Sequence, residues 1–340
     1  MIRRLVAGAG FLASILSQPG GPAVLAADPI IIAHRGASGY LPEHTLEAKA
    51  MAHAQGADFV EQDLVLTKDH VPVVLHDIQI DTVTDVAARF PDRRRPDGRW
   101  YALDLTLAEL QTLNVHERTD PKTGRAVFPN RFPLGVGSFR VPTLEAEVDL
   151  VEGLNRSTGR RVGIYPELKA PAWHRREGVE IGPIVLAILR RRGLDDPAAP
   201  CFVQCFEFDQ LRRLRAQGWR GRLIYLTTEE REPGGPDLAT PEGWAEVRQV
   251  ADGVGPNLAQ VVRCGPAGRI EPTDYTRRAH DHGLLVHPWT VRADALPPGV
   301  AAVEALLLGL TDGAGVDGLF IDQPDLGVQH RRNRPRRPAP

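Results

Sequence analysis

Cysteine is scarce in this chain, with three among 340 residues. Cys201 and Cys205 lie in one predicted strand, where a spacing of four residues puts both side chains on the same face but roughly 13 Å apart. That separation excludes a disulfide between them, and we expect both thiols in the core. A long-range bridge to Cys264 stays open, and the odd count leaves at least one free thiol.

Neither sign of charge dominates the chain. It has 41 lysines and arginines against 43 aspartates and glutamates, a formal net charge of −2, with 25% charged and 42% hydrophobic residues. This balance does not indicate a nucleic-acid-binding protein or a disordered chain. It is the composition of an ordinary soluble globular protein that can bury a large core.

The N-terminus lacks a hydrophobic run long enough to cross a bilayer. Its apolar run covers only residues 5–16, which is shorter than a membrane-spanning helix. The basic Ile2-Arg3-Arg4 precedes this run and the small residues of Val24-Leu25-Ala26 follow it, which is typical of a secretory signal peptide. We predict a cleaved signal at residues 1–27 and a periplasmic mature protein. No cysteine lies near the cleavage site, so no stable membrane anchor is expected.

The rest of the chain alternates short aliphatic or β-branched runs with helical stretches, and no glycine-rich dinucleotide fingerprint follows any run. Predicted strands cover residues 30–34, 59–66, 163–169, 201–206, 222–227, 253–257, 284–290 and 318–322. Predicted helices cover residues 45–55, 143–155, 179–192, 208–217, 244–250, 273–282 and 301–310, with Thr45 and Thr143 as N-caps. Eight such repeats close most economically into a (β/α)8 TIM barrel of the α/β class, at residues 28–328. A doubly wound open sheet is the alternative.

This rhythm breaks after the second barrel strand. Residues 71–76 form a predicted hairpin strand, and residues 78–141 are rich in proline, glycine, arginine and aspartate, with one weak helix at 107–113. We interpret 78–141 as a small inserted subdomain beside the mouth of the active site, because loops this long in a compact domain are usually functional or mobile. The basic, proline-rich residues 329–340 predict a disordered tail.

Polar residues cluster where three of the predicted strands end. His34, the pair Glu61 and Asp63, and His76 belong to or follow aliphatic runs, and a parallel barrel presents its catalytic groups at that end of its strands. Glu61 and Asp63 are two apart, so their side chains leave one face with roughly 6–7 Å between their origins. Two carboxylates in a desolvated pocket repel each other unless a cation joins them, and Ca²⁺ or Mg²⁺ prefers oxygen ligands. One histidine can act as base and the other as acid.

Several short motifs follow one another along the mature chain. They are His34-Arg35-Gly36, Pro42-Glu43-His44-Thr45, Glu61-x-Asp63, His76-Asp77, Tyr165-Pro166-Glu167-Leu168-Lys169, His287-Pro288-Trp289-Thr290 and Gly318-Leu319-Phe320-Ile321-Asp322. As an ordered set they resemble the glycerophosphodiester phosphodiesterase family, and closely its periplasmic bacterial form. The resemblance implies a TIM barrel with an inserted subdomain, a divalent metal, and hydrolysis of glycerophosphodiesters to an alcohol and sn-glycerol 3-phosphate.

The resemblance also implies roles for individual residues. It implies metal binding by Glu61, Asp63 and Glu167, acid/base catalysis by His34 and His76, and phosphate contacts from Arg35 and Lys169. Apart from the resemblance, we predict substrate contacts from Trp289 and Glu43. The expected cation is Ca²⁺, with Mg²⁺ as the alternative. Glu167 ends the third barrel strand, from which we expect its carboxylate to close the site opposite the other two. A phosphodiester gains negative charge in its transition state, and basic side chains with a cation suit that charge.

Some of these residues keep a second interpretation. Glu167 and Lys169 could form merely an ion pair. Glu43 could be a polar group near a helix start rather than a neighbour of the metal, and Trp289 could be core packing rather than a wall for the glycerol. Zinc is an alternative ion, although no third histidine or cysteine ligand occurs at a suitable spacing.

Two other functions compete with this one. A phospholipase C/D-like hydrolase of membrane phosphodiesters predicts an exposed aromatic rim, for which Trp100, Tyr101 and Phe128 are the candidates. A non-enzymatic binding protein predicts the loss of a metal or acid/base position, and none is lost. We therefore expect small glycerophosphodiesters, such as glycerophosphocholine and glycerophosphoethanolamine, as partners of an enzyme that could form a homodimer.

Overall fold

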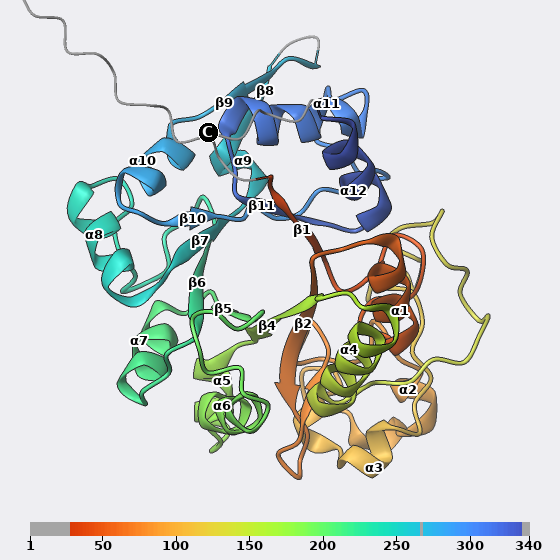
Figure 1. Ribbon diagram of the computed structural model, residues 1–340. Helices are drawn as coiled ribbons and strands as arrows, with labels where there is room; N and C mark the ends of the chain where they lie inside the picture. The colour runs from red at the N-terminus through yellow and green to blue at the C-terminus, as the bar shows by residue number, and fades with distance from the viewer. Residues whose placement is uncertain (1–27, 266–267, 335–340) are drawn as a thin grey trace, which may run out of the picture.

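The computed structural model describes residues 28–265 and 268–334, and the predicted signal peptide at residues 1–27 lies outside this range. Eight parallel strands form a ring, and helices cover the ring from outside (Figure 1). The strands are β1 (Ile30–Ala33), β2 (Phe59–Leu66), β4 (Gly163–Leu168), β5 (Phe202–Cys205), β6 (Arg222–Thr227), β7 (Gly253–Pro256), β10 (Leu285–Val286) and β11 (Gly318–Ile321). The predicted TIM-barrel architecture is confirmed.

The strands follow one another around the ring in the order β10-β7-β6-β5-β4-β2-β1-β11. Asp317 N donates to Val286 O at 3.0 Å and Phe320 N donates to Pro288 O at 3.0 Å, which links β11 to the β10 segment. The ring is therefore nearly closed, and it leaves little unpaired sheet edge. β10 is shorter than the predicted strand at residues 284–290, because the later residues of that stretch make only isolated bridges.

Helices form the outer layer. They are α1 (Leu46–Gln55), α4 (Leu144–Thr158), α5 (Pro171–Arg176), α6 (Ile181–Arg191), α7 (Phe208–Ala216), α8 (Pro241–Val250), α9 (Leu258–Val261), α10 (Tyr275–Asp281), α11 (Val303–Leu308) with η4 (Gly309–Ala314), and α12 (Pro324–Asn333). Both predicted caps are confirmed, since Thr45 Oγ1 accepts from Ala48 N at 3.2 Å and Thr143 Oγ1 accepts from Ala146 N at 3.1 Å. Within the described ranges, no helix has the length and apolar character needed to cross a bilayer.

Among the described residues outside the insertion, four short elements and one helix were not predicted. The short ones are α5, α9 and the antiparallel pair β8 (Val262–Cys264) and β9 (Ile270–Pro272). The helix is α12, which corrects the predicted disordered tail at residues 329–333. Its end is held by ion pairs of Arg331 with Asp58 and of Arg334 with Asp312, contacts that a basic composition does not reveal. Residues 335–340 lie outside the described range.

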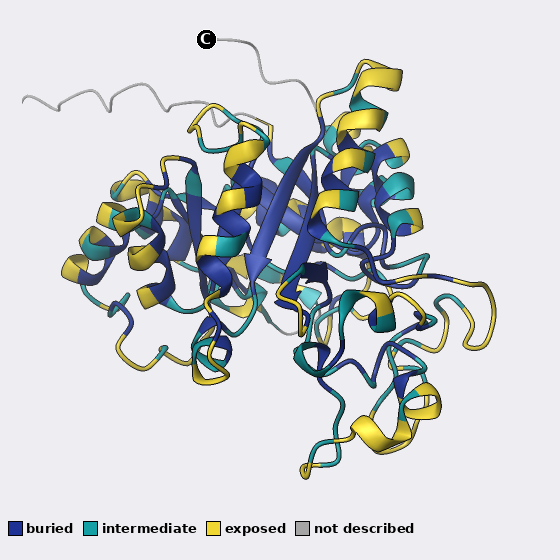
Figure 2. Ribbon diagram, turned by 90° about the horizontal axis from the view of Figure 1, so that it is seen from below, coloured by how far each residue is buried: buried dark blue, intermediate teal, exposed yellow. Residues whose placement is uncertain are grey.

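Apolar packing lies on both sides of the strand ring. Inside it, one cluster consists of Ile32, Phe59, Tyr165, Phe202, Ile224 and Phe320. Between strands and helices a larger cluster includes the fully buried Trp219 and Trp244. Figure 2 shows the strands buried and the outer helix faces exposed. Cys201 and Cys205 are buried as predicted, and all three cysteines are free, so the bridge to Cys264 that the sequence left open is not formed.

The insertion is an ordered unit with an apolar cluster of its own. β3 (Pro72–Val74) pairs antiparallel with β2, which confirms the predicted hairpin. The insertion then contains α2 (Val86–Arg89), η1 (Pro91–Arg93), η2 (Ala102–Asp104) and α3 (Leu107–Leu110). Ile80, Leu110 and Phe139 pack in one cluster with Val65 of β2 and with Val73 of β3. In Figure 1 this unit lies outside the ring, beside α1 and α4.

Candidate active site

Side chains at the carboxyl ends of the strands line one cavity. Its walls are His34, Arg35, Glu61, Asp63, His76, Glu167, Lys169, Gln204, Phe206, Leu226, Trp289, Thr290, Arg292 and Phe320. Every predicted site residue except Glu43 is in this set. The three carboxylates and two histidines expected to bind the metal and transfer protons therefore face a common space. It lies at the end of the barrel where TIM-barrel enzymes have their active sites.

The turn after β1 places the first of these groups. Arg35 and Gly36 both have positive φ, at 56° and 85°, and a side chain at Gly36 would come within 2.8 Å of the backbone carbon of Ala48 in α1. Only glycine tolerates that approach. The tight turn directs Arg35 N to Glu61 Oε2 at 2.9 Å, so the backbone of β1 and a carboxylate of β2 are joined directly.

The three predicted metal-binding carboxylates come together on two neighbouring strands. Glu61 and Asp63 leave the same face of β2, and Glu167 of β4 stands directly beside Asp63 in the strand register. One oxygen from each of the three lies within 4.8 Å of the others. The expectation that Glu167 closes the site from the opposite side is wrong, because β4 is the immediate neighbour of β2 in the ring.

This acidic triad fits a hard divalent cation. Asp63 Oδ1 is buried and has no hydrogen-bond partner among the described residues. Burial, together with the neighbouring charges of Asp63 and Glu167, raises the pKa of Glu61 well above its ordinary value. Burial also raises the pKa of Glu167, against the opposing effect of Lys169. Carboxyl groups that crowd one another in this way are the oxygen ligands that Ca²⁺ and Mg²⁺ take, and a set made only of carboxylates does not favour zinc.

Each of the two predicted catalytic histidines is bonded to an aspartate through the same ring nitrogen. His34 Nδ1 lies 2.6 Å from Asp322 Oδ1, and His76 Nδ1 lies 2.7 Å from Asp77 Oδ1. A carboxylate in that position fixes the tautomer and leaves Nε2 as the nitrogen that can exchange a proton. Burial, with Arg35 nearby, lowers the pKa of both histidines to about 4. Both rings are therefore neutral at neutral pH.

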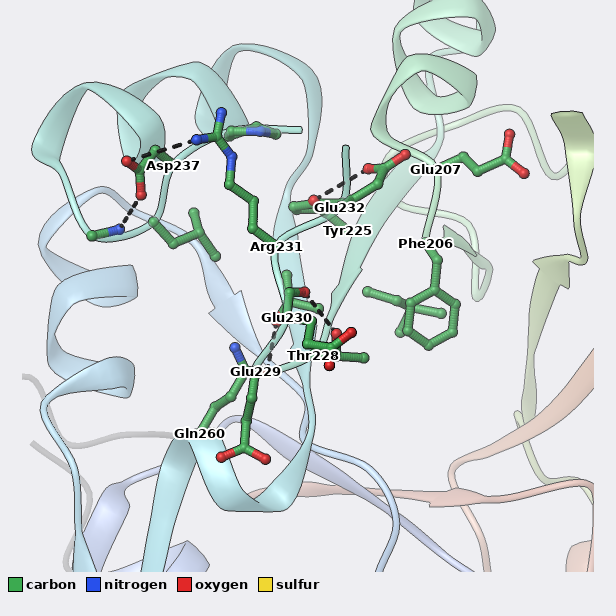
Figure 3. A pocket seen from close by; sticks show the side chains of 15 residues that line it. Phe206, Glu207, Tyr225, Thr228, Glu229, Glu230, Arg231, Glu232, Asp237 and Gln260 are labelled. Carbon is green, nitrogen blue, oxygen red and sulfur yellow. Dashed lines mark hydrogen bonds and ion pairs between the residues drawn. The ribbon is translucent and has the colours of Figure 1, made fainter. Parts of the chain in front are cut away.

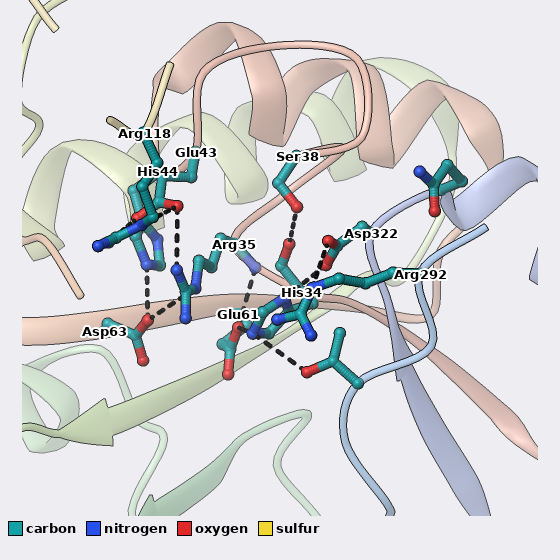
Figure 4. Close-up of polar contacts among 12 residues, drawn as sticks. His34, Arg35, Ser38, Glu43, His44, Glu61, Asp63, Arg118, Arg292 and Asp322 are labelled. Carbon is teal, nitrogen blue, oxygen red and sulfur yellow. Dashed lines mark hydrogen bonds and ion pairs between the residues drawn. The ribbon is translucent and has the colours of Figure 1, made fainter. Parts of the chain in front are cut away.

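Three basic side chains line the cavity where a phosphate would meet them. Arg35 and Lys169 were predicted, and Lys169 Nζ contacts Glu167 Oε1 at 2.7 Å. The ion pair that the sequence left open is therefore formed, and both of its side chains line the cavity. Arg292 was not predicted, although it follows the His-Pro-Trp-Thr motif by two residues; its Nε lies 3.0 Å from Asp322 Oδ2. Figure 4 shows Arg35 and Arg292 on either side of His34 and Glu61.

The two remaining predicted residues differ in their positions. Trp289 lines the cavity, with its ring edge-on to Phe206 at 5.6 Å and its Nε1 donating to Gly255 O at 2.8 Å. Glu43 does not line the cavity. Its carboxylate accepts from Arg35 Nη1 at 2.9 Å and from Arg118 Nη2 at 2.6 Å. The expected substrate contact of Glu43 is therefore replaced by a supporting contact to Arg35.

A buried chain of polar groups runs from Asp63 toward the outer helices. His44 Nε2 lies 2.7 Å from Asp63 Oδ2, and Lys49 Nζ lies 3.3 Å from His44 Nδ1. Lys49 Nζ also lies 3.2 Å from Glu147 Oε2, and both of these side chains are 0% exposed. Burial and the neighbouring Lys49 lower the pKa of His44 to about 3. A neutral His44 can thus accept from the ammonium and donate to Asp63.

Lys49→Met should destabilise the fold strongly, because it leaves Glu147 buried without its cation. We expect the free energy of unfolding to fall by about 3–5 kcal/mol. The double variant Lys49→Met/Glu147→Leu should recover part of that loss, since replacing both charges of a buried pair costs little. The rest should stay lost, because His44 Nδ1 and Glu61 O remain without the donor that Lys49 supplies. Urea unfolding measures both values. Equal losses in the single and double variants would contradict this account of the pair.

A second cavity of about 400 Å³ adjoins the catalytic one and shares Phe206 and Leu226 with it (Figure 3). Its walls come mainly from the end of β6 and the loop before α8. Glu232 Oε2 accepts from Tyr225 Oη at 3.3 Å. Glu229 and Glu230 are exposed and form no ion pair within the described residues. This space is therefore open, partly aromatic and acidic.

The model of the Glycerophosphoryl diester phosphodiesterase family matches residues 34–326. The chain belongs to this family. A glycerophosphodiester phosphodiesterase of Haemophilus influenzae is 41% identical over 94% of this chain and 95% of its own length. One of Treponema pallidum is 33% identical over 89% of this chain and 92% of its own length.

Solved structures show the same fold. A structure from Silicibacter pomeroyi, described as a protein of this family, has a TM-score of 0.66 at 26% identity and covers 90% of this chain and 93% of its own. An Oleispira antarctica phosphodiesterase, solved with the product sn-glycerol-3-phosphate, has a TM-score of 0.62 at 20% identity and covers 90% of this chain and 97% of its own. As a member of the family, the present chain is an enzyme of the phosphodiesterase class.

Several residues of this phosphodiesterase site were not assigned from the sequence. They are Asp77, Asp322, Gln204, Arg292, Arg118 and Arg131. Asp77 and Asp322 stand in the quoted motifs, next to His76 and at the end of the last strand, so their positions were visible but their partners were not. Arg118 and Arg131 lie in the insertion, where no periodic pattern indicates which side chains point inward.

Proposed function

We propose that this chain hydrolyses glycerophosphodiesters to an alcohol and sn-glycerol 3-phosphate, with one divalent cation and a histidine pair that moves the protons. The observation that carries the proposal is the cavity in which the acidic triad, two histidine–aspartate pairs and three basic side chains meet. The Haemophilus influenzae and Treponema pallidum relatives, both named for this activity, align over nearly the whole chain and support it.

In this proposal Glu61, Asp63 and Glu167 hold the cation. Ca²⁺ is the proposed ion and Mg²⁺ the alternative, because all three ligands are hard carboxylate oxygens. When bound, the cation supplies positive charge that stabilises the negative charge developing on the phosphate oxygens. Arg35 and Lys169 add fixed positive charge from the protein side, in a cavity that excludes much of the solvent.

The two histidines transfer the protons. One removes the proton from the glycerol hydroxyl next to the phosphate, whose oxygen then bonds to phosphorus while the bond from phosphorus to the alcohol oxygen breaks. The other histidine, which is neutral in the empty cavity, takes up a proton from solvent at Nε2 when the anionic phosphodiester binds, and it gives this proton to the leaving oxygen. A cyclic glycerol phosphate results. Water opens this ring with the two histidines in exchanged roles and yields sn-glycerol 3-phosphate.

Direct attack by water on the phosphodiester is the competing route. A substrate in which the neighbouring hydroxyl is replaced by hydrogen separates the two. It is inert if the hydroxyl is the nucleophile, and it is cleaved if water attacks directly. Trapping the cyclic phosphate during turnover of the ordinary substrate provides an independent check.

The second cavity supports amine-bearing alcohols such as choline and ethanolamine as leaving groups. The alcohol can extend past Phe206 into a space bordered by Tyr225, Glu229 and Glu230 (Figure 3), and carboxylates with aromatic rings suit a cationic head group. Glu229→Gln/Glu230→Gln should lower kcat/KM for glycerophosphocholine by about 2- to 30-fold, since exposed charge pairs contribute about 0.2–1 kcal/mol each. The kcat/KM for glycerophosphoglycerol, whose alcohol is neutral, should not change. Equal losses for both substrates would show that the cavity does not recognise the cation.

The phospholipase alternative required an exposed aromatic rim, and its three candidates do not form one. Tyr101 is 8% exposed and stacks on Trp173. Trp100 is half-buried and donates to Phe90 O at 2.7 Å, and Phe128 lies half-buried under the guanidinium of Arg131. Small water-soluble diesters are therefore the preferred substrate class. Vesicles of phosphatidylinositol or sphingomyelin should release no phosphorylated head group.

We further propose that the mature enzyme is periplasmic and begins near residue 28, as the apolar run and small residues of the first 27 indicate. Determining the N-terminus of the exported protein tests this. A homodimer stays a prediction, which sedimentation of the purified enzyme tests.

The proposed function is tested by measuring sn-glycerol 3-phosphate released from glycerophosphocholine, with and without a chelator. We expect release that stops with chelator and returns with added Ca²⁺ or Mg²⁺. Undiminished release after complete removal of metal would overturn the metal-dependent part of the proposal, and no release with any added cation would overturn the activity itself.

A further inference from the structure

The insertion contacts the aspartate of each histidine–aspartate pair through one arginine. Arg118 Nη1 donates to Asp77 Oδ2 at 2.6 Å, while the other oxygen of Asp77 holds His76 Nδ1. Arg118 also donates through Nη2 and Nε to the two oxygens of Glu43, which accepts in turn from Arg35 (Figure 4). The guanidinium of Arg118 therefore contacts the His76–Asp77 pair directly and is linked to Arg35 through the carboxylate of Glu43.

The second contact repeats this arrangement at the other histidine. Arg131 Nη2 donates to Asp322 Oδ2 at 2.6 Å, while Asp322 Oδ1 holds His34 Nδ1 at 2.6 Å. The Arg131 side chain is 4% exposed, and its remaining nitrogens donate to Asp294 and to Ser38 O. In the chain order, Arg131 is 191 positions from Asp322 and Arg118 is 41 positions from Asp77. The insertion thus reaches both ends of the catalytic cavity.

The chemistry of a histidine–aspartate pair explains why these contacts matter. An aspartate orients the ring only while its own carboxylate is held, and each of these carboxylates has one oxygen on a histidine and the other on an arginine. Asp77 is 30% exposed and follows the short strand β3, so without Arg118 its free oxygen would turn toward water. Asp322 is also 3.0 Å from Arg292, which gives it a second cationic partner. Each guanidinium holds a second carboxylate, Glu43 or Asp294, through a fork of two donors and reaches the aspartate of the histidine pair through one nitrogen. A lysine cannot reproduce this arrangement.

We propose that Arg118 and Arg131 are positioning residues, and that the insertion serves catalysis by fixing the tautomer and orientation of both histidines. This inference rests on the proposed function, which makes His34 and His76 the acid and the base. It goes beyond that function by giving the insertion a role in the chemistry. Within the described contacts, Arg118 is the only arginine that holds Asp77, whereas Asp322 also has Arg292. Loss of Arg118 should therefore disturb the orientation of His76 more than loss of Arg131 disturbs that of His34.

The kinetic test compares Arg118→Ala and Arg131→Ala with Arg95→Ala. Arg95 belongs to the same insertion and docks it to the barrel through Glu177 at 3.0 Å, but it contacts neither histidine pair, so it is the matched control. We expect kcat for glycerophosphocholine to fall about 10- to 100-fold in the first two variants, as for other residues that orient an active-site ligand. KM should rise only in Arg118→Ala, which also releases Arg35. Arg95→Ala should keep the kcat of the unaltered enzyme.

Two further measurements separate positioning from folding. Arg118→Lys and Arg131→Lys keep the charge and much of the packing but lose the fork, so their melting temperatures should stay near that of the unaltered enzyme while kcat still falls. Nitrogen-15 NMR of the histidine rings, assigned with His34→Gln and His76→Gln, should show Nδ1–H tautomers in the unaltered protein. In each arginine variant the ring on the altered side should become a mixture of tautomers.

The outcomes distinguish this inference from the proposed function. If the unaltered enzyme releases no sn-glycerol 3-phosphate, the proposed function fails, and the NMR measurement still decides whether the arginines fix the rings. If the unaltered enzyme is active but the arginine variants keep its kcat and its tautomers, the inference is wrong. It is equally wrong if Arg95→Ala loses as much activity as they do, because docking of the insertion alone would then be the cause.

Discussion

Glu61→Gln is expected to lower kcat for glycerophosphocholine by at least about a thousandfold and to abolish cation binding at the same time. Glu61 supplies one of three buried carboxylates whose oxygens lie within 4.8 Å of one another, and the cation proposed to bind there would provide several kcal/mol of charge stabilisation in the transition state. Since about 1.4 kcal/mol corresponds to a factor of ten in rate, loss of that term accounts for the expected decrease.

The melting temperature separates this loss from a folding defect. A ligand that binds the folded state raises it, so added Ca²⁺ should stabilise the unaltered protein and leave Glu61→Gln unchanged. Without cation, the variant should be about as stable as the unaltered protein. Removing one charge relieves the crowding that raises the pKa of Glu61, while the amide nitrogen leaves one of the two donors to Glu61, Arg35 N or Gln204 Nε2, without its acceptor. Glu152→Gln, a change at a half-exposed carboxylate of α4, is the control and should behave as the unaltered protein. A Glu61→Gln variant that is active and is still stabilised by the cation would contradict the proposal that Glu61 binds it.

Substitution of either histidine proposed as acid or base has the second largest expected effect. His34→Ala and His76→Ala should each lower kcat by about 10²- to 10⁴-fold, the usual contribution of positioned acid/base catalysis. KM should change little, because Arg35 and Lys169 remain to bind the phosphate. His280→Ala removes an exposed histidine that pairs with Asp317, and it should keep nearly full activity.

The leaving group then shows which histidine is the acid. p-Nitrophenol leaves without a proton, so a glycerophospho-p-nitrophenyl substrate should restore much of the rate in the variant that lacks the acid and little in the variant that lacks the base. Equal restoration in both variants, or none in either, would contradict the assignment of one acid and one base to this pair.

Much of the barrel could be predicted because its sequence signals are local. The strands are short aliphatic runs buried on both faces, and hydroxyl side chains such as Thr45 and Thr143 begin the helices as expected. The shared position of Glu61 and Asp63 was predictable for the same reason, because side chains two residues apart on a strand point to the same face of the sheet. Glu167 was identified, but its place beside Asp63 depends on which strand neighbours β2, a fact of topology rather than of local pattern.

The parts that could not be predicted depend on contacts between distant residues. Arg118 and Arg131 lie in an insertion with little regular structure, and only the folded chain shows that they end on Asp77 and Asp322. Glu43 was predicted to contact the substrate, with a polar position near a helix start as the alternative. The fold turns it toward Arg35 and Arg118 instead, because two guanidinium groups satisfy its buried carboxylate better than a phosphate of like charge.

The most direct test is a crystal structure of the enzyme grown with Ca²⁺ and sn-glycerol 3-phosphate. We predict one strong metal peak bound by Glu61, Asp63 and Glu167 at about 2.3–2.6 Å, the range of calcium–oxygen bonds, with the phosphate between His34 and His76 and touching Arg35. A peak elsewhere, or the ammonium of Lys169 occupying the space among the three carboxylates, would contradict the account.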